Sequence, residues 1–315
     1  MKKLAVGIDI GGTNSVFGFV DETGVCMSKS SVNTATFEEA TEFVDVVANE
    51  IKNTLTTLND IELIGIGIGA PNGNYYTGNI EFAPNLKWKG VIPLTDLFKK
   101  HFDLPVILTN DANAAAIGEM VYGNAKNMKD FIFITLGTGV GSGIVVNGKM
   151  VYGHDGNAGE IGHTITFPNG RLCSCGRHGC LEAYCSAKGI RATYLELLTK
   201  KDHSVDIPEE DITPKYIYEQ ALKGNMAAIK TFEFTGEVLG LTLSNSAAYT
   251  SPEAIFLFGG ISNAGDLILD PVRKSFEKYL LSIYKNKIKI LPSGIKENDA
   301  AILGAASMIW NQVSK

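Results

Sequence analysis

Three cysteines stand within eight residues of one another in Cys173-Ser-Cys-Gly-Arg-His-Gly-Cys180, and the chain has five cysteines in all. Such a cluster could form disulfides, a redox pair or a metal site. An odd number of cysteines cannot all pair with one another, and disulfides are rare in a reducing cytosol, so a metal is favoured. Zinc binds four nitrogen or sulfur ligands in a tetrahedron, and Cys173, Cys175 and Cys180 offer three thiolates.

His163 is the expected fourth ligand, because it precedes Cys173 by ten positions, a separation that a short hairpin can close. The sequence therefore predicts a structural Zn²⁺ site with four protein ligands and no open position. The alternative is a loop of buried thiols beside a solvated histidine. Cys26 and Cys185 lie outside this spacing.

Two glycine-rich turns between apolar strands suit phosphate. They are Asp9-Ile-Gly-Gly-Thr-Asn14 and Leu136-Gly-Thr-Gly-Val-Gly-Ser-Gly143. Glycine lets the backbone approach an anion, and successive N–H groups form a concave nest. Neither turn matches a Walker loop or a dinucleotide fingerprint, and singly each is more often a tight hairpin than a ligand loop. Together they could hold a triphosphate, with Asp9 orienting Mg²⁺ through water.

Asp111 is the candidate acceptor for a proton. It follows the apolar stretch Val106-Ile-Leu-Thr, so its carboxylate is expected at the carboxyl end of a strand, where α/β proteins bind ligands. The pair Asn110-Asp111 would also suit the start of a helix. Position alone leaves the catalytic and the capping role open.

The elements that position these residues alternate between strand and helix. Apolar patterns predict strands at 4–10, 16–20, 61–69, 105–109, 131–136, 143–146 and 254–258, and helices at 37–55, 114–120, 183–198 and 227–248. The strands at 131–136 and 143–146 are expected to form a hairpin with Asn147-Gly148 as its closing turn. The pattern is that of an α/β protein.

Composition limits the class of protein. With 315 residues, of which 45% are hydrophobic and 20% charged, the chain can form two globular lobes. A net charge of −6 without a Lys/Arg cluster predicts no nucleic-acid partner. No apolar run reaches the length of a membrane span and no leader pattern precedes the first strand, so a cytoplasmic protein with no membrane partner is expected.

The chain resembles the ROK family of sugar kinases, within the actin-like ATPase fold. The resemblance rests on Asp9-Ile-Gly-Gly-Thr, Asn110-Asp-Ala-Asn-Ala-Ala-Ala, Leu136-Gly-Thr-Gly-Val-Gly, and Gly159-Glu-Ile-Gly-His163 followed by CSCGRHGCLE. It implies a two-lobed (ribonuclease H-like) α/β fold with a mixed β-sheet in each lobe and a zinc-bound loop. The small lobe would comprise 1–112 and 301–315, including a C-terminal helix at about 299–312, and the large lobe 113–300.

The resemblance also implies a set of site residues. Asp111 would be the catalytic base, and the zinc would aim Glu160 and Glu182 at the sugar. The implied sugar contacts are Asn85, Asn110, Asp111, Glu160, His163 and Glu182. The implied contacts to ATP and Mg²⁺ are Asp9, Gly11, Gly12, Thr13, Asn14, Gly137, Thr138, Gly139, Gly141, Gly259 and Gly260. Many relatives carry Lys where this chain has Asn14, which leaves more of the phosphate binding to backbone amides and Mg²⁺.

The activity that the resemblance implies is ATP-dependent phosphorylation of a hexose, with the conversion of glucose to glucose 6-phosphate as the first choice. The expected assembly is a homodimer or a homotetramer. An N-acetylhexosamine kinase, acting on N-acetylglucosamine or N-acetylmannosamine, is the alternative within the class. A non-catalytic sugar-responsive regulator is the alternative outside it. The repressors of the family carry a helix-turn-helix domain, for which a first strand at about residue 4 leaves no room.

Overall fold

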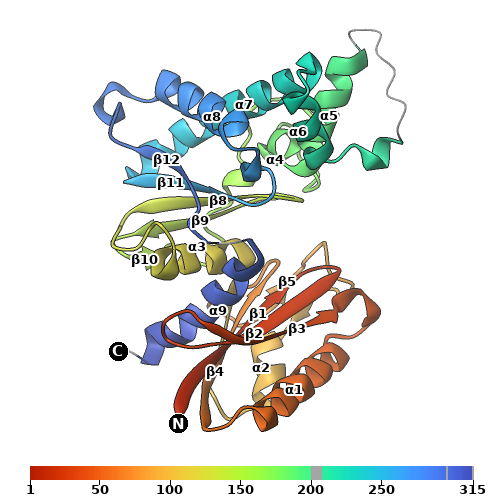
Figure 1. Ribbon diagram of the computed structural model, residues 1–315, viewed down its shortest axis with the longest axis vertical. Helices are drawn as coiled ribbons and strands as arrows, with labels where there is room; N and C mark the ends of the chain where they lie inside the picture. The colour runs from red at the N-terminus through yellow and green to blue at the C-terminus, as the bar shows by residue number, and fades with distance from the viewer. Residues whose placement is uncertain (200–207, 296, 314–315) are drawn as a thin grey trace. The chain divides into compact units, whose positions relative to one another are not determined.

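Figure 1 shows the computed structural model of the chain, which describes residues 1–199, 208–295 and 297–313. The chain forms two compact units. Unit 1 comprises Met1–Asn127, Met150–Ala158 and the described residues from Gly294 onward, and unit 2 comprises Met128–Lys149 and the described residues of Gly159–Ser293. Each unit is built on a mixed five-stranded sheet, so the predicted two-lobed α/β fold is confirmed.

The sheet of unit 1 has the strand order β3-β2-β1-β4-β7. Its strands are β1 (Lys2–Ile10), β2 (Asn14–Val20), β3 (Cys26–Asn33), β4 (Ile61–Ala70) and β7 (Val106–Asn110). β1, β4 and β7 run parallel, while β2 and β3 pair antiparallel. The parallel strands therefore end at the same edge of the sheet, which brings Asp9 and Asn110 to one side.

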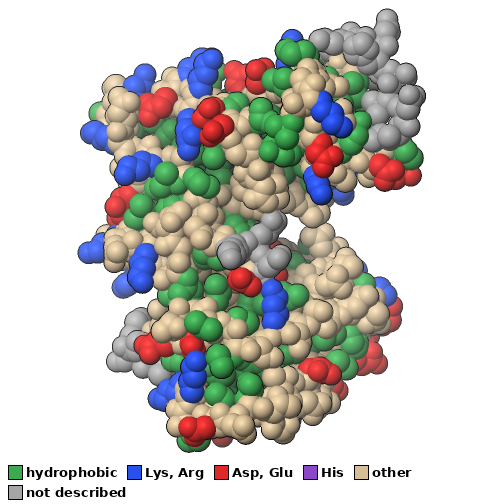
Figure 2. Space-filling model, viewed as in Figure 1, with side chains coloured by type: hydrophobic (Ala, Val, Ile, Leu, Met, Phe, Trp, Pro, Cys, Tyr) green, Lys and Arg blue, Asp and Glu red, His purple; other side chains and the backbone are tan. Residues whose placement is uncertain are grey.

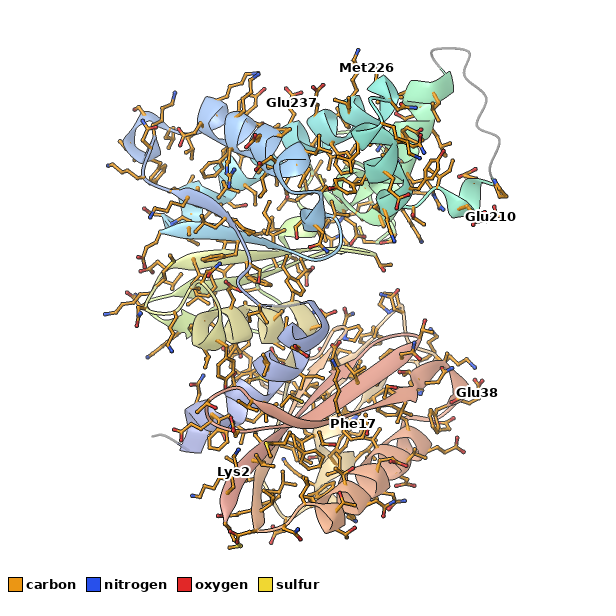
Figure 3. All side chains as sticks on the ribbon, viewed as in Figure 1. Lys2, Phe17, Glu38, Glu210, Met226 and Glu237 are labelled. Atoms are coloured by element: carbon orange, nitrogen blue, oxygen red, sulfur yellow. The ribbon has the colours of Figure 1, made fainter. Side chains whose placement is uncertain are left out.

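Helices cover both faces of this sheet. The hydrophobic core on one face combines β1, β2 and β4 with α1 (Ala40–Thr57) and α2 (Leu94–Lys99). In this core lies Phe17 of β2, labelled in Figure 3. The other face packs against α3 (Asp111–Tyr122) and the C-terminal helix α9 (Glu297–Val313). A short hairpin of β5 (Ile80–Glu81) and β6 (Val91–Ile92) completes the unit.

Glycines in β4 let α9 approach the sheet closely. A Cβ added to Gly67 would lie 1.8 Å from the carbonyl oxygen of Ala305, which no side chain could relieve. α3 packs on the same helix, because Ile117 belongs to one apolar cluster with Ile302 and Ile309. The expected lobe boundary after residue 112 would cut α3, whereas this packing keeps the whole helix in unit 1.

The sheet of unit 2 has the order β10-β9-β8-β11-β12. Its strands are β8 (Phe131–Leu136), β9 (Val140–Val146), β10 (Lys149–Met150), β11 (Ala254–Phe258) and β12 (Lys289–Pro292). The helices α4 (Glu182–Cys185), α5 (Ala187–Thr199), α6 (Pro214–Leu222), α7 (Met226–Thr250) and α8 (Asp266–Tyr279) lie on one side of this sheet (Figure 1). The core between them holds Ile132, Ile134, Leu243, Leu257 and Val272.

The hairpin of β8 and β9 differs from its prediction. β9 begins at Val140, and the turn between the two strands is formed by residues 137–139. Asn147-Gly148 instead joins β9 to β10, with φ of 52° and 71°, the left-handed geometry of a tight hairpin turn. The assignment of this dipeptide to the β8–β9 hairpin was therefore wrong, because the glycine-rich stretch before it already reverses the chain.

The surface is mixed in charge. On the face shown in Figure 2, Lys and Arg side chains are interspersed with Asp and Glu. Within the described ranges, no helix is both long and apolar enough to cross a membrane.

Candidate active site and metal centre

The first glycine-rich turn joins β1 to β2 in unit 1. The Gly11 N–H donates to the Asn14 carbonyl at 3.1 Å and closes the turn. The N–H groups of Gly12 and Thr13 donate to no acceptor among the described residues. Two successive backbone donors are thus open to an anion, as a phosphate nest requires. Gly12 also lies against Asn85, whose carbonyl oxygen would be 2.4 Å from a Cβ added at Gly12.

Two carboxylates lie at the carboxyl end of the same sheet. Asp9 stands in β1 opposite Gly69 of β4, and Asp111 begins α3 directly after β7. A Cβ added to Gly69 would be 3.9 Å from Asp9 Oδ1 and 3.5 Å from the Asp111 Cα. Burial and the charge of Asp111 raise the pKa of Asp9 to about 7, against a lowering by Lys29. The sequence pattern predicted both residues, but their proximity follows only from the parallel strand order.

Asp111 is well suited to accept a proton. The Asn110 side chain caps α3 by accepting the Ala112 N–H at 2.9 Å, and Asp111 Oδ1 accepts the same N–H at 2.8 Å. Within the described chain Asp111 Oδ2 accepts no hydrogen bond. Although Asp111 remains solvent-accessible, surrounding protein atoms withdraw its carboxylate from bulk water and raise its pKa, against the lowering by the Ala112 N–H. A carboxylate with a raised pKa is a stronger base than an ordinary Asp.

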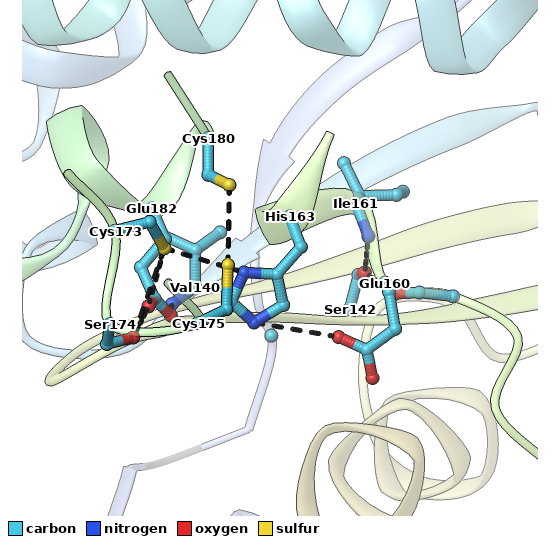
Figure 4. A network of polar contacts seen from close by, with 12 residues as sticks. Val140, Ser142, Glu160, Ile161, His163, Cys173, Ser174, Cys175, Cys180 and Glu182 are labelled. Carbon is cyan, nitrogen blue, oxygen red and sulfur yellow. Dashed lines mark hydrogen bonds and ion pairs between the residues drawn. The ribbon is translucent and has the colours of Figure 1, made fainter. Parts of the chain in front are cut away.

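The predicted metal ligands come together in unit 2. His163, Cys173, Cys175 and Cys180 each offer one ligand atom, and these four atoms lie within 4.8 Å of one another (Figure 4). The Cys173 N–H donates to the Arg177 carbonyl at 2.8 Å and so closes the loop. A β-bridge between Ile165 and Cys180 aligns the histidine segment with it.

The chemistry of this donor set fits zinc. Desolvation tends to raise the pKa of the Cys175 thiol, but hydrogen bonds from the Arg177 backbone and guanidinium bring that pKa down to about 6. Burial raises the pKa of the neighbouring Cys173 and Cys180 thiols, so Cys175 is the one of these three thiols whose pKa lies below neutral pH without a metal. Three sulfurs and one imidazole are the ligands of a closed structural zinc site.

His163 uses its two ring nitrogens toward different neighbours. Nδ1 lies 3.7 Å from Cys173 Sγ, and Nε2 lies 4.0 Å from Glu160 Oε2 (Figure 4). One imidazole can thus bind a metal through Nδ1 and leave Nε2 beside Glu160. The predicted roles of His163 as metal ligand and as sugar contact are compatible for this reason.

The second glycine-rich turn joins β8 to β9 in unit 2. The Gly137 N–H donates to the Gly139 carbonyl at 3.0 Å, and the Gly141 N–H donates to Thr135 Oγ1 at 3.0 Å. In the part of the chain that the structure describes, the N–H groups of Thr138 and Gly139 have no acceptor. Both glycine-rich turns therefore present two open donors in succession.

The predicted Gly259-Gly260 loop adjoins this second turn. A Cβ added to Gly259, whose φ is 100°, would lie 2.5 Å from the Leu136 carbonyl oxygen. The end of β11 and the β8–β9 turn are thus neighbours, as two contacts to one nucleotide would require.

Glu182 and Ser142 add contacts that the sequence did not reveal. The Glu182 carboxylate accepts the Val140 N–H and the Ser174 hydroxyl, so it bonds to the first residue of β9, directly after the second turn, and also to the cysteine loop (Figure 4). Ser142 accepts the Ile161 N–H at 3.2 Å and donates to the Gly159 carbonyl, which holds the segment around Glu160. The only sequence signal for the role of Ser142 is that it is a serine within a glycine-rich strand.

Comparison with known proteins gives a consistent result. Residues 5–312 match the sequence profile of the ROK family. A glucokinase of Streptomyces coelicolor is 36% identical over 313 residues, covering 97% of both chains. A xylose repressor of Caldicellulosiruptor bescii is 31% identical over 271 residues, covering 84% of this chain and 66% of the repressor. A solved ROK family glucokinase from Streptomyces griseus, in complex with glucose and AMPPNP, has a TM-score of 0.81 at 33% identity, covering 97% of this chain and 98% of that one.

Proposed function

Because the chain belongs to the ROK family, we propose that it is an ATP-dependent hexose kinase that converts glucose to glucose 6-phosphate. Support comes from the similarity to glucokinases over nearly the whole chain. The observation that carries the proposal is the position of Asp111, which begins α3 at the carboxyl end of the sheet near Asp9, itself just before the first glycine-rich turn, and whose Oδ2 accepts no hydrogen bond from the described residues.

In this mechanism the oxygen of the sugar 6-hydroxyl attacks the γ-phosphorus of ATP, and ADP leaves. Asp111 Oδ2 accepts the proton that the hydroxyl loses. Asn110 and Asn85 of unit 1, with Glu160, His163 and Glu182 of unit 2, are the proposed sugar contacts. Carboxylates and imidazole suit vicinal hydroxyls because each accepts or donates along defined directions.

The phosphates of ATP are assigned to the two turns. Gly11, Gly12, Thr13 and Asn14 in unit 1 and Gly137, Thr138, Gly139 and Gly141 in unit 2 offer backbone donors, and Gly259 and Gly260 are assigned to the nucleoside. Asp9 can hold Mg²⁺ through water, and the ion would neutralise phosphate charge during the transfer. A zinc ion on His163 and the three cysteines would hold their loop rigid.

The test is a coupled assay of ADP release by the purified chain. Glucose, mannose, N-acetylglucosamine and N-acetylmannosamine are compared, and the product is identified by its phosphate position. We expect the highest kcat/KM with glucose. Preference for an N-acetylhexosamine would replace the substrate assignment, and sugar binding without ADP release from any of them would indicate a regulator. The proposed homodimer or homotetramer is tested in parallel by sedimentation.

A further inference from the structure

We propose that Glu182 is a positioning residue that links the cysteine loop to the β8–β9 turn, so that metal binding tightens the binding of nucleotide. The inference rests on the proposed function in one respect, namely that this turn binds phosphate. All contacts that support it lie within unit 2.

The two carboxylate oxygens of Glu182 contact two different segments of unit 2. Oε2 accepts the Val140 N–H at 3.0 Å, and Val140 directly follows the turn. Oε1 accepts the Ser174 hydroxyl at 2.7 Å and lies 3.7 Å from Cys173 Sγ. Hydrogen bonds to a carboxylate are shorter and stronger than those between neutral groups. The Glu182 side chain therefore connects, through hydrogen bonds, two loops that are far apart in sequence.

The Glu182 carboxylate lies directly against the β8–β9 turn. A Cβ added to Gly139 would be 2.6 Å from Glu182 Oε2, so only glycine leaves space for the carboxylate there. The neighbouring N–H groups of Thr138 and Gly139 are the ones that donate to no acceptor in the described residues. Because two of its three residues, Gly137 and Gly139, are glycines, the turn would otherwise sample many conformations. Holding Val140 in place limits this freedom and so lowers the entropy cost of binding an anion.

Ser174, which donates to Glu182 Oε1, belongs to the loop that carries the cysteine ligands. Ser174 stands between Cys173 and Cys175, and all three belong to one short loop. A metal that fixes the two thiolates also fixes the Ser174 hydroxyl, and with it Glu182. Metal removal releases this loop and therefore loosens the turn.

The test measures AMPPNP binding with Mg²⁺ by calorimetry, in the absence of sugar, so that a sugar contact of Glu182 has no effect on the result. For metal-loaded Glu182→Ala we expect the Kd of AMPPNP to rise about fivefold or more, the usual size of a coupling between sites. Glu182→Gln, whose amide oxygen can still accept the Val140 N–H, should recover most of the affinity. The matched control is Glu233→Ala, which removes an exposed carboxylate of α7 in the same unit and should leave the Kd of AMPPNP unchanged.

A second comparison removes the metal with a chelator, and the zinc content is measured in every sample. Wild-type protein should lose affinity for AMPPNP on metal removal, whereas Glu182→Ala should lose little more, because the two changes break the same link. Ser174→Ala, at an exposed position where folding is not at risk, should raise the Kd in the same direction.

Equal AMPPNP affinity in wild type, Glu182→Ala and Ser174→Ala would overturn the inference. So would an equal effect of metal removal in wild type and Glu182→Ala. A wild-type chain that binds no AMPPNP would instead contradict the proposed function itself, and the two failures are thereby distinguished.

Discussion

At the scale of single residues, two proposed roles of Asp111 can be separated, namely a contact at the start of α3 and the acceptance of a proton. Asn110 already caps α3, so Asp111→Asn should leave the unfolding midpoint and the sugar affinity close to those of wild type. The amide cannot accept the proton of the hydroxyl, and we expect kcat to fall by ~10² or more, the usual contribution of a general base. Steady-state kinetics with glucose and a direct sugar titration check both parts. Turnover near that of wild type would remove Asp111 from the role of base.

Asp9 is a residue whose ionisation costs stability. Its pKa is about 7 in the folded chain and near 3.8 without burial, so between these values the folded state holds a proton that the unfolded chain has released. The free energy of unfolding therefore falls as the pH rises from about 4 to 7. Asp9→Asn cannot ionise, so it should exceed wild type in stability at pH 8, by on the order of 4 kcal/mol, and match it near pH 4.

Urea unfolding at several pH values without Mg²⁺ checks this prediction for Asp9, because a bound cation would favour the ionised form. The same variant should lose kinase activity if Asp9 orients Mg²⁺. Parallel pH profiles for wild type and Asp9→Asn would show that the carboxylate does not carry this pH dependence.

At the scale of elements, the contact between β4 and α9 depends on a missing side chain. Gly67→Ala would place a Cβ 1.8 Å from the Ala305 carbonyl oxygen, and a rotamer change cannot relieve this clash, because neither the position of a Cβ nor that of a backbone oxygen depends on a side-chain torsion. We expect the free energy of unfolding to fall by about 3 kcal/mol. Gly137→Ala is the matched control for stability, because an added Cβ there meets no atom within 4 Å. A loss in Gly67→Ala no larger than in the control would mean that α9 can shift away.

The cysteine loop is the second element whose structure can be tested directly. Purified protein never exposed to chelator should contain one zinc per chain by elemental analysis, as four ligands within 4.8 Å of one another indicate. Cys175→Ser should lose the metal and raise the KM for sugar, because the loop that holds His163 and Glu182 would no longer be fixed. Absence of stoichiometric metal from the wild-type chain would exclude the zinc site.

At the scale of the whole molecule, the proposed sugar contacts are divided between the two units, with Asn85 and Asn110 in unit 1 and Glu160 in unit 2. A ligand that uses groups of both units favours the arrangements in which both can reach it. Glucose should therefore tighten AMPPNP binding about fivefold or more, and AMPPNP should tighten glucose binding by the same factor. Calorimetric titration of each ligand with and without the other measures both factors, and identical affinities would show that the sites are independent.

The sequence by itself determined those features that depend on neighbours in the chain. Three cysteines and a histidine within 18 residues were predicted to cluster as metal ligands, because a short hairpin can bring them together, and their ligand atoms lie within 4.8 Å of one another. The apolar strands and the glycine-rich turns were predicted for the same reason. The sequence did not predict β3, because its exposed residues alternate with half-buried ones and it contains no apolar run. It did not predict α2 either, because six residues are too few to show a helical repeat of apolar positions.

Only the tertiary structure decided what distant residues do to one another. Glu182 bonds to Val140, 42 residues away, and Asp9 has a raised pKa through burial and through the charge of Asp111, which the parallel order of β1, β4 and β7 brings near. Gly65 and Gly67 of β4 are required because α9, which begins more than 200 residues later, packs directly against them. Residue type sets which bonds a group can form, but chain reversal, strand order and packing set which partner is within reach, and these depend on the whole core.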